Sequence, residues 1–140
     1  METREAIANG ALDIDFVINV GELKNRNYRY IYNEIKAIVD ACAADVVVKV
    51  IFEVCLLTPE EIIDVAILSV AAGAHFVKTS TGFSTSGATP EAIDSMLTVV
   101  GPNALVKASG GVRDKDVVLQ YLRAGVRRIG TSAGIDICKL

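Results

Sequence analysis

Residues 58–81, TPEEIIDVAILSVAAGAHFVKTST, contain a complete helix-then-strand unit and decide the fold class. Thr58 and Pro59 precede two glutamates, which together supply a capping hydroxyl, a proline at the first helical position and acids in the first turn. Gly73 then predicts the end of the helix, and a short apolar run with Lys78 inside it predicts a strand. A helix followed at once by a buried strand is typical of parallel α/β folds.

The same unit recurs along the chain. Apolar, β-branched runs predict strands over 13–20, 46–53, 76–81, 104–109 and 128–132, and helical periodicity predicts helices over 28–43, 59–72, 90–99 and 114–124. No linker-like segment divides the chain, so we expect one domain over residues 1–140. A closed eight-stranded barrel rarely has fewer than about 200 residues, so five strands predict a small open sheet or part of a barrel.

Composition excludes several classes of protein. The chain is 51% apolar with a net charge of -3, which argues against a disordered protein and against nucleic acid or an anionic membrane as a partner. No apolar stretch reaches the roughly 18 residues of a membrane span, and the first ten residues do not resemble a signal peptide. Cys42, Cys55 and Cys138 have no metal-ligand or disulfide spacing, so we expect reduced thiols, no metal site and a cytoplasmic location.

Three lysines lie within apolar strands. Any one of them is ordinarily an edge residue or one that extends to solvent. However, 29 residues separate Lys49 from Lys78 and Lys78 from Lys107, so we expect all three at one height in successive strands. Asp15 and Ser132 continue the series at each end. Grouping and burial lower the pKa of a lysine, and a neutral amine can attack a carbonyl to form a Schiff base.

Glycines and hydroxyls follow three of the predicted strands, in KTSTG (78–82), KASGG (107–111) and GTSAG (130–134). Backbone N–H groups and hydroxyls at a strand end that leads into a helix suit a phosphate group. Each segment alone is more often only a turn. Their coincidence with the lysines favours a phosphate-binding edge.

These residues resemble a known family. VKTSTGFSTSGAT (77–89) and VKASGGVRDKDV (106–117) are similar to the two lysine strands of the deoxyribose-phosphate aldolases, a class I family that reacts through a Schiff base. DIDFVINVGELK (13–24), VVVKVIFEVCLLT (46–58) and RRIGTSAG (127–134) resemble further family segments in order and spacing, and the match corresponds to the family's C-terminal two-thirds.

The resemblance implies a TIM (β/α) barrel, here partial, with about five parallel strands and without the opening strands. It also implies cleavage of 2-deoxy-D-ribose 5-phosphate to acetaldehyde and D-glyceraldehyde 3-phosphate, a step of deoxyribonucleotide catabolism. The family uses no metal and no organic cofactor, and the partner is a small phosphosugar.

The resemblance also implies the roles of individual residues. Lys78 matches the Schiff-base lysine, Lys107 the second lysine that assists proton transfer and helps to keep its partner neutral, and Asp15 the aspartate of the proton relay. Lys49 matches a supporting lysine of the adjacent strand. The segments expected to bind phosphate contain Gly82, Gly110, Gly111, Ser132 and Ala133. Ala133 stands where some members have a second serine, so only its backbone N–H would serve.

Two other interpretations stay open. One is a catalytically silent, truncated barrel, or a fragment that works only within an oligomer. The other is a different phosphate-binding barrel enzyme, which the strand lysines disfavour because phosphate binding does not require them. The open edges of a five-stranded segment predict a homo-oligomer.

The remaining polar residues have ordinary interpretations. We expect His75 on the surface or at the start of a strand, Asp13 as a cap or salt-bridge partner, and Glu53 near the rim or in an ion pair. A mild basic cluster is interpreted as a solvated face: Arg123, Arg127, Arg128 and Lys139.

Overall fold

The computed structural model describes residues 13–42, 45–81, 87–110, 112 and 114–130. Within them, five strands form one parallel sheet in which each strand pairs with the next along the chain. The strands are β1 (Asp13–Val17), β2 (Val47–Ile51), β3 (Phe76–Lys78), β4 (Leu105–Ser109) and β5 (Arg128–Gly130). The predicted parallel α/β sheet is confirmed, although strands β1 to β4 are each shorter than their apolar runs.

Four longer helices connect the strands: α3 (Tyr28–Ala41), α4 (Pro59–Ala71), α5 (Pro90–Val100) and α6 (Lys115–Ala124). All four lie where the periodicity predicts them. The Thr58 hydroxyl accepts a hydrogen bond from the Glu61 backbone N–H, and the Glu61 carboxylate accepts one from the Thr58 N–H, which completes a capping box. The longest helix that the structure describes has 14 residues, and none of the described helices could span a membrane.

Two short elements were not predicted. Helix α2 (Val20–Lys24) begins inside the first apolar run, because the Asn19 side chain accepts a hydrogen bond from the Glu22 N–H and caps the helix there. The 3-10 helix η1 (Val54–Leu56) follows Glu53, whose backbone is left-handed with φ 54°. Neither is long enough to show helical periodicity in the sequence.

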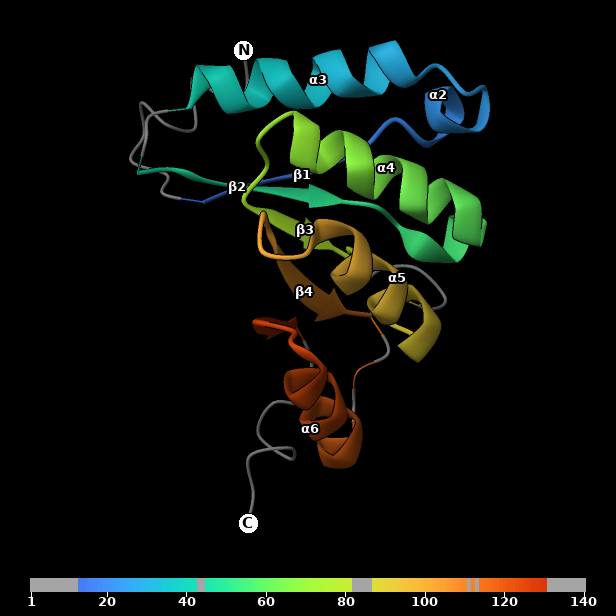
Figure 1. Cartoon of the computed structure of the whole chain (residues 1–140), viewed down its shortest axis with the longest axis vertical. Coiled ribbons are helices and arrows are strands. Elements are labelled where there is room, and N and C mark those ends of the chain that lie inside the picture. The colour runs from blue at the N-terminus through green and yellow to red at the C-terminus, as the bar shows by residue number, and fades with distance from the viewer. Residues whose placement is uncertain (1–12, 43–44, 82–86, 111, 113, 131–140) are drawn as a thin grey trace.

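The helices lie along one side of the sheet (Figure 1). Successive side chains of a strand point to opposite faces, so one set of strand residues packs under the helices and the other faces away from them. The helix-facing set is fully buried and apolar: Val48, Val50, Val77, Val106 and Ala108. The opposite face bears the charged residues of the strands, and it is the face that would line the interior of a barrel.

Candidate active site

The strand register decides which lysines meet. Lys78 of β3 is paired directly with Lys107 of β4. Lys49 of β2 is paired with Asp15 on one side but with Phe76 on the other, so it lies one side-chain layer before Lys78. The expectation of one common height is therefore correct for Lys78 and Lys107 and wrong for Lys49.

The last strand departs from the expected spacing as well. Lys107 is paired with Arg128, so the residue of β5 at the height of Lys107 is Arg128 and not Ser132. Strands of a barrel are staggered along its circumference, and equal spacing in sequence does not measure that stagger.

The Asp15 carboxylate bridges the two layers of lysines. Its Oδ2 atom lies 3.5 Å from Lys78 Nζ, and its Oδ1 atom lies 3.6 Å from Lys49 Nζ. The lysine side chains are only 13% and 6% exposed, respectively, whereas Asp15 is 32% exposed. A buried ammonium group is unfavourable without a partner, so this shared carboxylate allows both lysines to occupy the sheet face.

The surroundings of Lys107 lower the pKa of its amine. Burial lowers its pKa, and the positive charges of Lys78 and Lys49 lower it further, while the Asp15 carboxylate opposes them. Arg128 contributes in the same direction as the lysines. Lys107 therefore gives up its proton more readily than an ordinary lysine, which suits a group that exchanges protons with a substrate.

A glycine on β5 makes room for the Lys107 side chain. A Cβ atom at Gly130 would lie 3.3 Å from Lys107 Cε and 2.9 Å from Ser109 Cβ. Both contacts are tighter than side chains ordinarily make, so a residue larger than glycine would push against the lysine. The sequence places Gly130 only within a turn-like segment and gives no sign of this role.

A second group of charges surrounds the amine of Lys49. The Asp13 Oδ2 atom accepts a hydrogen bond of 3.1 Å from Lys49 Nζ and lies 3.5 Å from Arg128 Nη1. The hydrogen bond from Lys49 is the main reason that the pKa of Asp13 is lowered. The guanidinium of Arg128 stacks 4.6 Å from the centre of the Phe76 ring.

These contacts confirm the interpretation of Asp13 and show that the one of Arg128 is wrong. Asp13 is a salt-bridge partner, as predicted. Arg128 does not belong to a solvated helix and loop face, because it lies on the lysine-bearing face of the sheet. Only its pairing across the sheet reveals this, and no local pattern records that pairing.

Hydroxyl groups tie the ends of β3 and β4 together. The Thr79 hydroxyl donates to the Ser109 carbonyl at 2.6 Å and accepts from the Ser109 N–H at 2.9 Å. The Ser109 hydroxyl donates to the Ser80 carbonyl at 2.6 Å. Gly110 follows with φ 84°, and a Cβ there would lie 2.8 Å from Ser80 Oγ, so this turn requires glycine.

The other expected phosphate-binding residues lie outside the described residues: Gly82, Gly111, Ser132 and Ala133. At the edge of this region, the Glu53 carboxylate accepts hydrogen bonds from the Thr81 N–H at 2.7 Å and from the Thr81 hydroxyl at 2.9 Å. Glu53 thus links the end of β2 to the segment after Lys78.

Other candidate residues take no part in this cluster. His75 lies just before β3, where its Nδ1 atom accepts a hydrogen bond from the Val48 N–H, so its predicted place at the start of a strand is confirmed. Cys42 and Cys55 are free thiols, and burial raises the pKa of Cys42, which keeps it protonated. Cys138 lies outside the described residues.

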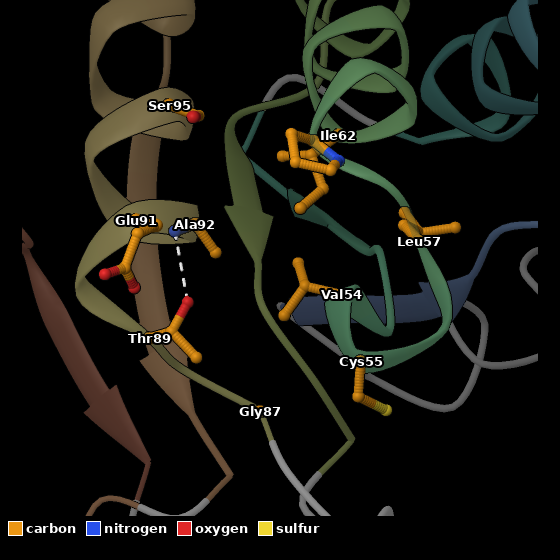
Figure 2. Close-up of a pocket in the computed structure, with 10 residues that line it drawn as sticks. Val54, Cys55, Leu57, Ile62, Gly87, Thr89, Glu91, Ala92 and Ser95 are labelled. Carbon is orange, nitrogen blue, oxygen red and sulfur yellow. Dashed lines mark hydrogen bonds between the residues drawn. The ribbon is translucent and has the colours of Figure 1, made fainter.

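A separate cavity of about 200 Å³ lies between η1, the start of α4 and the start of α5 (Figure 2). Its lining is mainly apolar and includes Val54, Cys55 and Ile62. The residues that line it include none of the three strand lysines. The candidate chemistry therefore lies on the other face of the sheet, around Lys78.

Comparison with known proteins finds similarity to aldolases. Residues 1–140 match the family model described as DeoC/LacD family aldolase. The chain is 54% identical over 138 residues to a deoxyribose-phosphate aldolase of Clostridium perfringens, and the match covers 99% of this chain and 62% of that protein. It is 57% identical over 136 residues to that of an Exiguobacterium species, which covers 97% and 61%.

Solved structures agree in fold. The deoxyribose-phosphate aldolase of Aeropyrum pernix, described as a unique tetramer, superposes with a TM-score of 0.83 at 32% identity over 97% of this chain and 57% of that one. An aldolase designated QR15 gives a TM-score of 0.88 at 39% identity over 97% and 61%. The chain thus spans about 62% of the length of the curated relatives, and the five strands that the structure describes form part of a TIM barrel. The chain belongs to the DeoC/LacD aldolase family.

Proposed function

We propose that this chain carries the reactive lysine of a deoxyribose-phosphate aldolase, which cleaves 2-deoxy-D-ribose 5-phosphate to acetaldehyde and D-glyceraldehyde 3-phosphate. One observation carries the proposal: Lys78 lies in register with a second lysine and has the Asp15 carboxylate 3.5 Å from its amine. A nucleophilic amine needs a neighbouring group that moves protons, and this arrangement supplies two such groups.

The proposed cleavage can be written with the Lys78 amine, the substrate and water. The neutral Lys78 amine attacks the aldehyde carbon of the open-chain sugar, and the resulting carbinolamine loses water to form an iminium ion. The iminium accepts the electron pair of the C2–C3 bond as the C3 hydroxyl loses its proton, which releases glyceraldehyde 3-phosphate. The remaining enamine takes up a proton at C2, and water then releases acetaldehyde and restores the amine.

Asp15 and Lys107 are the proposed proton carriers for these steps, directly or through water. Asp15 contacts Lys78 and is partly exposed, so it can reach both the carbinolamine hydroxyl and solvent. The lowered pKa of Lys107 lets this lysine alternate between its charged and neutral forms more readily than an exposed lysine does.

The phosphate of the substrate would bind beyond the carboxyl ends of β3, β4 and β5, the edge at which α/β barrels bind their ligands. Gly110 belongs to that edge, and its left-handed backbone turns the chain just after β4. The expected contributions of Gly82, Gly111, Ser132 and Ala133 remain part of the proposal.

Trapping with borohydride tests the assignment directly. The protein is incubated with acetaldehyde and sodium borohydride, digested and analysed by mass spectrometry. We expect a stable adduct on the peptide that contains Lys78, and its loss in Lys78→Met. Lys36→Met is the matched control, because Lys36 is an exposed lysine that pairs with Asp40 on α3. An adduct that is unchanged in Lys78→Met would refute the role of Lys78.

A second candidate function is a barrel segment that reacts only when further strands cover its lysine-bearing face. It is favoured by the exposure of apolar side chains on that face, where Val17 is 42% and Leu105 is 39% exposed. In that case Lys78 would be labelled weakly in the isolated chain, and release of glyceraldehyde 3-phosphate in a coupled assay would be absent.

A further inference from the structure

Asp13 and Arg128 lie on strands at opposite ends of the described sheet, yet their side chains meet. Three strands separate β1 from β5, and neighbouring strands are about 4.8 Å apart. The distance of 3.5 Å between Asp13 Oδ2 and Arg128 Nη1 therefore requires the sheet to curve strongly around its charged face. Phe76 of β3 lies beneath both cations, with Lys49 Nζ 5.9 Å and the Arg128 guanidinium 4.6 Å from its ring centre.

The charges on this face form an unbroken alternating series. In order, its members are Arg128, Asp13, Lys49, Asp15 and Lys78, and each lies within 3.6 Å of the next. Lys49 is the central member and the most buried, with a side chain only 6% exposed. A movement of the Lys49 ammonium group would therefore change its contact with Asp15, and Asp15 also contacts the proposed nucleophile, Lys78.

The two aspartates compete for Lys49. Its Nζ atom lies 3.1 Å from Asp13 Oδ2, within hydrogen-bond distance, but 3.6 Å from Asp15 Oδ1. An ammonium group this buried requires a charged partner. If Asp13 lost its charge, the Lys49 ammonium would close on Asp15 Oδ1 and turn that carboxylate away from Lys78.

We propose that Asp13 is a positioning residue of the aldolase site, which holds Lys49 at a distance from Asp15 so that the Asp15 carboxylate remains directed at Lys78. The inference rests on the proposed function of Lys78. Arg128 supports Asp13 from β5 and is itself fixed by the Phe76 ring. Neither Asp13 nor Arg128 touches the proposed nucleophile, so both act through the intervening charges.

The test measures the rate of borohydride trapping of acetaldehyde at Lys78 in the 140-residue chain. Asp13→Asn keeps the shape and removes the charge, whereas Asp13→Glu keeps the charge. Because proton transfer by a positioned group contributes about 100-fold or more, we expect Asp13→Asn to slow trapping about tenfold and Asp13→Glu to restore it to within about threefold of wild type. A purely structural role of Asp13 would not distinguish the two variants in this way. The matched control is Asp64→Asn, since Asp64 lies on α4 and accepts a hydrogen bond from the Tyr28 hydroxyl of α3, away from the charged face.

Circular dichroism tests whether each variant is folded. Should Asp13→Asn fail to fold, Arg128→Met replaces it, and the same reasoning predicts about threefold slower trapping because Asp13 loses its support. A folded Asp13→Asn that traps at the wild-type rate overturns the inference, as does an Asp13→Glu as slow as the Asn variant. Trapping at the wild-type rate in a folded Arg128→Met also overturns it when Asp13→Asn is unfolded. A wild-type chain that is not labelled at Lys78 overturns the proposed function itself and the inference with it.

Discussion

Lys78 and Lys107 are paired across neighbouring parallel strands, so two cationic side chains leave the same sheet face at the same height. This placement is unfavourable for two full positive charges, and it coincides with a lowered pKa at Lys107. Burial is the largest cause, followed by the charges of Lys78 and Lys49, with Asp15 acting in the opposite direction. The pair thus places the proposed nucleophile, Lys78, beside a lysine whose lowered pKa favours proton exchange.

The first prediction concerns the sign of these effects. Lys78→Met removes a nearby positive charge, so the pKa of Lys107 should rise toward its ordinary value. Asp15→Asn removes the opposing negative charge, so the pKa of Lys107 should fall further. Both changes can be followed by NMR titration of ¹³C-labelled lysine side chains. Lys36→Met serves as the control and should leave the titration of Lys107 unchanged. Shifts of the same sign in the two variants would contradict the account.

The second prediction concerns the space beside Lys107. Gly130→Ala places a methyl group 3.3 Å from Lys107 Cε and 2.9 Å from Ser109 Cβ, so the lysine or the strand must move. We expect a loss of about 1–3 kcal/mol in the free energy of unfolding, as for other overpacked sites, and slower trapping at Lys78. Urea denaturation and mass spectrometry measure the two effects.

Gly21→Ala is the matched control for this substitution. Gly21 lies in helix α2, and an added Cβ would meet only an ordinary contact of 3.5 Å with Asn19 Oδ1. Alanine favours a helix over glycine by about 1 kcal/mol, so this variant should be as stable as the wild type or more so. Equal behaviour of the two alanine variants would show that Gly130 is not needed for space.

Local chemistry made much of the fold predictable. The start of α4 could be read from the sequence because a capping hydroxyl, a proline and a returning glutamate act within a few residues of each other. The heights of Lys49 and Arg128 could not be read in this way. They depend on how far each strand is displaced along its neighbour, and that displacement is set by packing across the whole sheet.

The same distinction applies to the site. Lys78, Lys107 and Asp15 could be proposed from the sequence because each is a charged residue inside an apolar strand, which is unusual in any sequence, and their individual roles come from the family resemblance. The roles of Arg128 and Gly130 could not be identified in this way, because they depend on contacts between residues far apart in sequence. Arg128 of β5 contacts Asp13 of β1, and Gly130 of β5 lies against Lys107 and Ser109 of β4. Thr79 belongs to the same class, because its partner is 30 residues away.

The third prediction concerns that hydroxyl. Thr79→Val preserves the shape of the side chain but removes the donor to the Ser109 carbonyl and the acceptor for the Ser109 N–H. Both residues are buried, so the unpaired N–H should destabilise the protein by about 1–3 kcal/mol in urea denaturation. Thr98→Val on the exposed face of α5 is the control and should change stability by less than about 0.5 kcal/mol. The interpretation is wrong if both variants have the stability of the wild type.

The fourth prediction concerns acid. The hydrogen bond from the Thr58 N–H and the one from Lys24 hold the pKa of Glu61 below its ordinary value. Because the folded pKa is the lower one, the stabilisation is complete above the unfolded value of about 4.3 and is lost as the pH falls through the folded value. Glu61→Gln should therefore be less stable than the wild type at neutral pH, and the difference should disappear in strong acid. Chemical denaturation across this pH range, with Glu60→Gln as the control, checks the prediction.

The last prediction concerns the lysine-bearing face and the ends of the sheet. Within the described residues, β1 pairs only with β2 and β5 only with β4, so each leaves one edge without a strand partner. Val17 of β1 and Leu105 of β4 are apolar and exposed on the uncovered face. Parallel sheets are ordinarily covered on both faces, and an exposed apolar face with open edges favours association.

We therefore expect the 140-residue chain to form oligomers in solution, with weak turnover. Light scattering should give at least twice the monomer mass of 14.9 kDa. Val17→Lys places a charge in the contact and should shift the chain toward the monomer. Leu119→Lys changes an exposed residue on α6, on the helix side of the sheet, and should leave the mass unaltered. A monomeric wild type that releases glyceraldehyde 3-phosphate rapidly would show that five strands suffice for both solubility and catalysis, because nothing else would then cover the face around Lys78.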